Sequence, residues 1–172
     1  MSEIFHRCVG LDRNFTSDEY ARWLEDHPEG TSCIVYKYEG FEYNFWDVCL
    51  NAREALKWQD DGHYNFRIRV AKAADGWLVG LDYFHGNGGY GHDPSLKSKK
   101  RYTSEREAVY TALDYMRQAI EKVIAEAEQR RPALIMDDED REAAKAPAKL
   151  NKMLRVVTDY MQQFDPRQLT LF

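Results

Sequence analysis

The stretch that most restricts the fold runs from His63 to Phe84 and reads HYNFRIRVAKAADGWLVGLDYF. Apolar and polar residues alternate before and after the turn signal Asp75-Gly76. Successive side chains of a strand point to opposite faces of a sheet, so this period of two indicates two strands with one buried face. The apolar positions of that face are Tyr64, Phe66, Ile68, Val70, Trp77, Val79, Leu81 and Tyr83. The stretch therefore predicts a β-hairpin.

Three segments around this hairpin carry helical patterns. Residues 16–30, TSDEYARWLEDHPEG, begin with a cap signal at Thr16 or Ser17 and end at Pro28 and Gly30, which predicts a short helix. A long helix is expected after Thr103 or Ser104, with Glu107 completing a capping box from Ser104. Residues 149–164, KLNKMLRVVTDYMQQF, repeat apolar residues at helical spacing, and Asp165-Pro166 should end that helix.

Two further segments lie between the first helix and the hairpin. SCIVYKYEGFEYNF, residues 32–45, is rich in β-branched and aromatic residues and breaks at Glu39-Gly40, which predicts a strand or a small hairpin. NFWDVCLNAREALKW, residues 44–58, places Phe45, Cys49, Ala52 and Leu56 along one stripe. We expect a helix there, closed by the turn at residues 60–62.

These elements together predict an α+β fold, in which an antiparallel hairpin or small sheet is packed by helices and a C-terminal amphipathic helix follows. The expected division is an α+β domain over 1–131, an acidic linker rich in Pro and Ala over 132–148, the amphipathic helix over 149–164, and a tail over 165–172. The last helix must dock on the domain or on a partner, and a homodimer through it is one alternative.

Composition sets bounds on the class of protein. With 44% hydrophobic residues in 172, the chain can bury a sizeable core. It has no apolar run of about 18 residues and no secretory signal pattern, so we expect a cytoplasmic protein. Cys8, Cys33 and Cys49 are odd in number and form no CxxC pair, which favours reduced thiols over a disulfide framework or zinc site.

The net charge of −5 is unevenly distributed. Between Glu126 and Glu142 there are seven acidic residues against three basic ones, whereas between His63 and Tyr110 eight basic residues stand against five acidic ones. A locally basic module therefore precedes an acidic connector.

The last five residues, Gln168-Leu169-Thr170-Leu171-Phe172, place three apolar side chains where chains are usually polar. All five positions match the pentapeptide through which bacterial polymerases, repair factors and mobile-element proteins bind the β sliding clamp, and the segment resembles that motif. An extended peptide places alternate side chains on opposite sides, so a groove can take Leu169 in one pocket and Leu171 with Phe172 in another. By the same resemblance, Gln168 would bond at the pocket rim and Thr170 would face outward.

The resemblance implies a non-enzymatic bacterial accessory protein of DNA replication or repair, or of a phage, plasmid or other mobile element, with the β sliding clamp as its partner. An inhibitor that occupies the clamp pocket fits the same residues. A third alternative makes the tail structural, with Leu169, Leu171 and Phe172 packed as a final strand or under the last helix. The protein would then be a nucleic-acid or small-ligand-binding module.

A basic and aromatic segment is the candidate nucleic-acid interface. The loop HGNGGYGHDPSLKSKKRY, residues 85–102, combines glycines with lysines and tyrosines. The candidate residues, taken with two arginines on the polar face of the hairpin, are Arg67, Arg69, Tyr90, Lys97, Lys99, Lys100 and Arg101. Such side chains could contact phosphates weakly and stack on unpaired bases of DNA or RNA. The alternative is an ordinary solvated loop.

The sequence gives little indication of nucleotide binding, metal binding or catalysis. The glycines follow neither the Walker nor the dinucleotide pattern, so no nucleotide cofactor is expected. His85, His92 and Asp93, or His6 with Cys8, lack the spacing of a metal site. No local motif marks a nucleophile with its base, which leaves no catalytic residue to nominate. The aromatic residues between Tyr20 and Trp46 indicate a core more than a ligand pocket.

Overall fold

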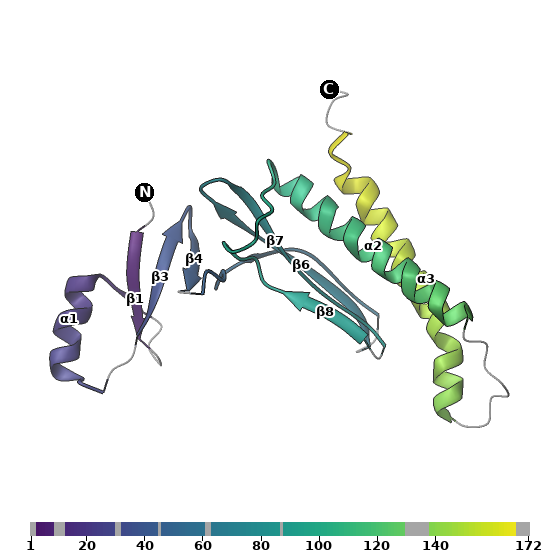
Figure 1. Cartoon of the computed structure of the whole chain (residues 1–172), viewed down its shortest axis with the longest axis horizontal. Coiled ribbons are helices and arrows are strands. Elements are labelled where there is room, and N and C mark those ends of the chain that lie inside the picture. The colour runs from purple at the N-terminus through teal and green to yellow at the C-terminus, as the bar shows by residue number, and fades with distance from the viewer. Residues whose placement is uncertain are drawn as a thin grey trace.

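The computed structural model describes residues 3–8, 13–29, 32–44, 46–60, 63–86, 88–129 and 138–167. These residues form eight strands and three helices, arranged as two antiparallel sheets with helices packed against them (Figure 1). This is the expected α+β fold. In chain order the elements are β1 (Glu3–Cys8), β2 (Asn14–Phe15), α1 (Ser17–Asp26), β3 (Ser32–Tyr38), β4 (Phe41–Asn44), β5 (Arg53–Gln59), β6 (Tyr64–Ala73), β7 (Gly76–His85), β8 (Gly88–His92), α2 (Glu105–Gln129) and α3 (Asp138–Phe164).

The first sheet has the strand order β2-β1-β3-β4 and carries α1. A full capping box starts α1, since the Thr16 hydroxyl accepts from the Glu19 N–H while the Glu19 carboxylate accepts from the Thr16 N–H at 2.8 Å. β3 and β4 form the small hairpin expected over 32–45. Glu39 and Gly40 both adopt positive φ in its turn, as a two-residue hairpin connection requires.

The second sheet has the order β5-β6-β7-β8 and contains the hairpin predicted over 63–84. The turn between β6 and β7 is formed by Ala74 and Asp75 in place of the expected Asp75-Gly76. The two strands pair with Phe66 opposite Tyr83 and Ile68 opposite Leu81. Each of these four residues is at most 8% exposed. The period of two in the sequence thus identifies the buried face correctly.

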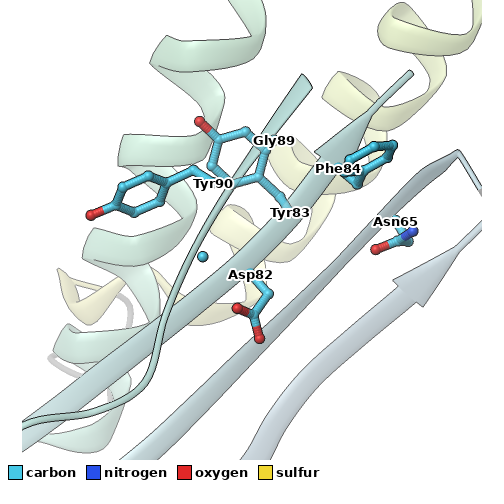
Figure 2. Close-up of a pocket in the computed structure, with 7 residues that line it drawn as sticks. Asn65, Asp82, Tyr83, Phe84, Gly89 and Tyr90 are labelled. Carbon is cyan, nitrogen blue, oxygen red and sulfur yellow. The ribbon is translucent and has the colours of Figure 1, made fainter. Parts of the chain in front are cut away.

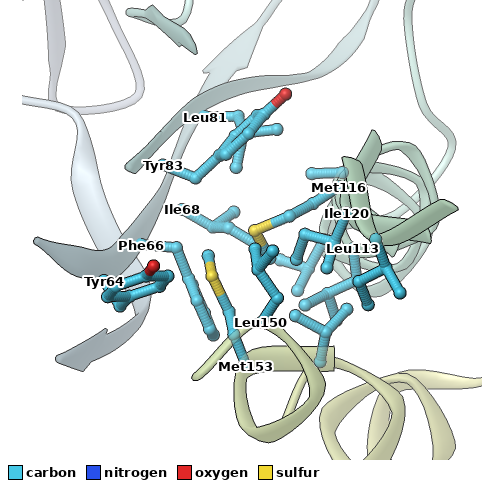
Figure 3. Packing of buried hydrophobic residues seen from close by; sticks show 14 of the residues in the cluster. Tyr64, Phe66, Ile68, Leu81, Tyr83, Leu113, Met116, Ile120, Leu150 and Met153 are labelled. Carbon is cyan, nitrogen blue, oxygen red and sulfur yellow. The ribbon is translucent and has the colours of Figure 1, made fainter. Parts of the chain in front are cut away.

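α2 and α3 pack side by side over that buried face (Figure 1). Figure 3 shows their side chains meeting those of the sheet, with Met116 and Ile120 from α2 and Leu150 and Met153 from α3. Met153 and Val157 are fully buried in this cluster. The apolar stripe of α3 therefore packs within the same chain, and a homodimer through this helix would have to use its exposed side.

A second cluster of buried residues joins the two sheets. Tyr43 of β4 and Cys49 pack against Ala71, Ala73 and Leu78 on the face of the second sheet that lies away from the helices. The Tyr43 hydroxyl donates to the Lys72 carbonyl at 2.7 Å.

The helix expected over residues 44–58 is wrong, because this segment forms a turn followed by β5. The side-chain oxygen of Asn44 accepts hydrogen bonds from the N–H groups of Trp46 and Val48, both at 3.0 Å, and so stabilises a turn against a helix. Leu56 and Trp58 then face the helices as part of a strand paired with β6. An irregular register between Glu54 and Leu56 interrupts the alternation that would have indicated this strand.

Two other segments also differ from expectation. The loop predicted over 85–102 contains β8, which pairs with β7 from Leu81 to His85. The segment expected to be a linker over 132–148 is helical from Asp138 onward, and Pro147 lies inside α3. Its residues are rich in Ala, Glu and Lys, whose helix propensity outweighs the one hydrogen bond lost at the proline.

Candidate nucleic-acid interface

The residues predicted to contact nucleic acid are distributed over three places in the structure. Arg67 and Arg69 lie on the face of the second sheet that points away from the helices, because they alternate with the buried Phe66 and Ile68. Tyr90 lies on β8, at the edge of this sheet. The four remaining basic residues lie in the segment between β8 and α2, and among them Arg101 forms an ion pair with a described carboxylate, that of Asp75, whereas the three lysines form none.

The two arginines of the open sheet face already have carboxylate partners. Both guanidinium groups contact Asp82 of β7, and Arg69 also contacts Asp93. Arg69 is mostly buried, with 20% of its side chain exposed. These contacts offset the positive charge of Arg67 and Arg69 that was expected to attract phosphates.

A shallow hollow of about 370 Å³ lies beside this arginine pair, between β7 and β8 (Figure 2). Asn65, Asp82 and Phe84 line it together with Gly89 and Gly91. A Cβ on Gly89 would lie 2.5 Å from the Tyr83 carbonyl oxygen, and one on Gly91 would lie 2.6 Å from the Asp82 carboxylate. These glycines therefore allow β8 to pack closely on β7, which explains the glycine-rich sequence without a bound phosphate.

Tyr90 is 47% exposed and belongs to a row of aromatic rings on the helix side of β8. Its ring lies 6.2 Å from that of Tyr83 and 5.8 Å from that of Tyr115 on α2. Tyr90 and the Arg67 side chain thus point to opposite faces of the sheet. A nucleic-acid strand bound to one face could therefore not contact both residues.

Arg101 organises the loop that precedes α2. Its guanidinium donates to the Asp75 carboxylate at 2.7 Å and to the Leu96 carbonyl at 2.9 Å, and also to the Ser98 carbonyl. The hydrogen bond from Arg101 lowers the pKa of the Asp75 carboxyl below its usual value. Because its donors are used inside the loop, Arg101 positions the neighbouring lysines and is not itself free for a ligand.

The lysines of this loop point to solvent. Lys97, Lys99 and Lys100 are exposed, and none forms an ion pair with any residue that the structure describes. The Lys100 ammonium lies 5.2 Å from the centroid of the Tyr102 ring. Tyr102 exchanges backbone hydrogen bonds with Trp77 at 2.9 and 3.1 Å, and this contact ties the loop to the hairpin turn.

Two cations near this loop were not identified from the sequence. Lys72 lies opposite Trp77 in the hairpin, with its ammonium 5.0 Å from the centroid of the Trp77 ring. In the sequence, Lys72 continues the alternating positions that are predicted to be buried, and the hairpin turn brings Trp77 opposite it. This pattern could have indicated the contact between the two side chains. We call the four lysines Lys72, Lys97, Lys99 and Lys100 the basic end; Lys72 and Lys100 lie over the rings of Trp77 and Tyr102, which are joined by backbone hydrogen bonds.

The second such cation, Arg106, connects the basic end to the C-terminal segment. From the first turn of α2 its guanidinium donates to the carbonyls of Gln163 and Asp165, the latter at 3.2 Å, which places a positive charge at the end of α3. The Arg167 side chain and N–H donate to the Asp165 carboxylate and lower its pKa to about 2. The candidate tail, Gln168 to Phe172, lies outside the described residues.

The described residues offer little support for catalysis or metal binding. Burial raises the pKa of the Cys49 thiol to about 11, so it stays protonated at neutral pH and is a poor nucleophile. In the part of the chain that the structure covers, no three His, Cys, Asp or Glu side chains are grouped to hold a metal ion. Within that same part, every helix is too short or too polar to cross a membrane.

Comparison with known protein families, with curated proteins and with solved structures finds no match to this chain.

Proposed function

We propose that the protein is a non-enzymatic bacterial accessory factor of DNA replication or repair, or of a mobile element, that binds the β sliding clamp through Gln168 to Phe172. The observation that carries the proposal is the match of all five residues to the clamp-binding pattern. The proposed partner encircles bacterial DNA, so the protein would act in the cytoplasm.

The residues just before the tail are consistent with this role. α3 ends at Phe164, and Pro166 cannot continue the helix. Arg167, the last described residue, has 82% of its side chain exposed. A short peptide leaving the surface at this point could enter a groove on another protein, and two or three buried anchors would supply most of its binding energy.

Titration of the full-length protein against purified β clamp, without DNA, tests the proposal. The double variant Leu171→Ala/Phe172→Ala removes two apolar anchors, and each anchor is expected to contribute at least about 2 kcal/mol, or about thirtyfold in Kd. Thr170→Ala is the matched control, because the resemblance turns this residue outward, and it should bind almost as the wild type does.

Thermal unfolding of the same variants separates binding from folding. The proposal expects the double variant to keep the wild-type Tm while losing the clamp. Clamp binding that survives in the double variant would contradict the proposal. Absence of clamp binding by the wild type, with a Tm several degrees lower in the double variant, would show that the tail belongs to the core.

A further inference from the structure

We infer that the basic end, formed by Lys72, Lys97, Lys99 and Lys100, binds the phosphate backbone of duplex DNA next to the clamp. The choice of DNA as the polyanion rests on the proposed function, because the clamp would bring this surface to DNA. The lysine surface itself is argued from contacts and charge.

The lysines of the loop are exposed, and the nearby acidic groups already accept hydrogen bonds. Lys97, Lys99 and Lys100 form no ion pair with a described residue, although the charge of Lys100 acts on the Glu107 carboxyl and helps to lower its pKa. Asp75 is bonded to Arg101, and Glu107 accepts hydrogen bonds from the Thr103 hydroxyl and N–H at 2.6 and 2.8 Å. A cluster of exposed lysines with few free acids is the usual footprint of phosphate binding.

The basic end fits duplex DNA better than single-stranded DNA. Binding of single strands relies on exposed aromatic rings that stack on unpaired bases. Here Tyr102 is only 6% exposed, and the Lys72 ammonium lies over the Trp77 ring. Ammonium groups without an accessible ring can contact phosphates but cannot read or stack on bases, which favours the paired duplex and binding without sequence preference.

A series of contacts connects the basic end to the end of α3, from which the candidate tail continues. Lys72 contacts Trp77, Trp77 bonds to Tyr102, and Tyr102 leads into α2, where Arg106 holds the carbonyls of Gln163 and Asp165. The start of α2 and the end of α3 lie at the same end of the α2–α3 pair (Figure 1). A tail anchored in the clamp would therefore hold the lysines close to the DNA, at a high local concentration.

The test measures binding of the full-length protein to a 5′-labelled duplex of about 30 base pairs by fluorescence anisotropy, with no clamp present, at increasing salt. Three to four phosphate contacts predict a slope of about −3 in log K against log salt concentration. The variant Lys97→Glu/Lys99→Glu/Lys100→Glu should bind at least about tenfold more weakly at low salt, and its slope should fall toward zero.

The matched control reverses the same number of charges elsewhere on the surface, in Lys57→Glu/Lys122→Glu/Arg155→Glu. It has the same net charge as the test variant, so a general charge effect would weaken both equally. Equal loss in the two triple variants, or no duplex binding by the wild type at low salt, would overturn the inference. A single strand of the same sequence should bind no more tightly than the duplex; tighter binding to it would contradict the duplex assignment.

Clamp titrations distinguish failure of this inference from failure of the proposed function. The lysine variant should bind free clamp as the wild type does, and should lose only the added affinity for clamp loaded on DNA. The Leu171→Ala/Phe172→Ala variant should show the reverse, with duplex binding intact and clamp binding lost. A lysine variant that keeps the full added affinity on DNA-loaded clamp would contradict a role of the basic end beside the clamp.

Discussion

At the scale of single residues, Tyr43 has the clearest structural role. Its ring is 1% exposed at the junction of the two sheets, and its hydroxyl donates to the Lys72 carbonyl at 2.7 Å. Burial raises the pKa of the Tyr43 hydroxyl well above its usual value, so the group remains a donor at any physiological pH. The bond also fixes the backbone of Lys72, a member of the basic end.

Removal of this hydroxyl should weaken the contact between the two sheets without leaving a cavity, because the ring stays in place. Tyr43→Phe leaves the Lys72 carbonyl without its donor, and we expect the free energy of unfolding to fall by about 1 to 2 kcal/mol. Urea denaturation measures the change. Tyr115→Phe, whose ring is 52% exposed, should change stability by less than about 0.5 kcal/mol. Equal effects of the two changes would contradict a specific role for Tyr43.

At the scale of secondary structure, α3 depends on a few side chains that enter the core. Met153 is fully buried between α2 and the second sheet, whereas Gln162 is exposed. Between Asn151 and Gln163 the charged and polar residues of α3 are exposed, which is the amphipathic pattern of a docked helix.

Met153→Ala should lower the free energy of unfolding by about 2 to 5 kcal/mol, because it removes buried methylene groups and leaves a cavity. Gln162→Ala should be almost neutral. Differential scanning calorimetry of both variants tests the docking of α3, and a Met153→Ala protein as stable as the wild type would show that the helix does not pack in this way.

The elements differ in how well the sequence predicts them, for physical reasons. The buried positions of the central hairpin are predicted correctly because one face is fully buried, which enforces strict alternation from Tyr64 to Val70, whereas the turn lies one residue earlier than expected. The sequence pattern does not predict the edge strands β5 and β8. In β5, Ala55 interrupts the alternation, and in β8 three of the five residues are glycines, which have no side chain to alternate. Edge strands bury less, so their sequences carry a weaker pattern.

At the scale of the whole molecule, the arrangement of charge depends on contacts that no local pattern contains. Arg106 contacts residues that lie 57 and 59 positions later in the chain. The lysine loop could be identified from the sequence as basic, but the link that Arg106 forms between the start of α2 and the end of α3 could not. Likewise, Asp82 could not be recognised in advance as the partner of both Arg67 and Arg69.

In the proposed arrangement the tail would bind the clamp, and the basic end would add a salt-dependent contact with DNA. Neither contact needs to be strong alone, because linked weak sites raise the affinity of one another through local concentration. We expect the tail by itself to be sufficient for recognition of the clamp.

The most direct measurement is a competition experiment with a synthetic peptide of residues 163–172, QFDPRQLTLF, against the complex of full-length protein and clamp without DNA. We expect the peptide to displace the protein with a Kd on the order of micromolar and within about tenfold of that of the full chain, because the same few anchors bind in both. A peptide that fails to displace a protein that does bind the clamp would show that recognition lies elsewhere and contradict the account.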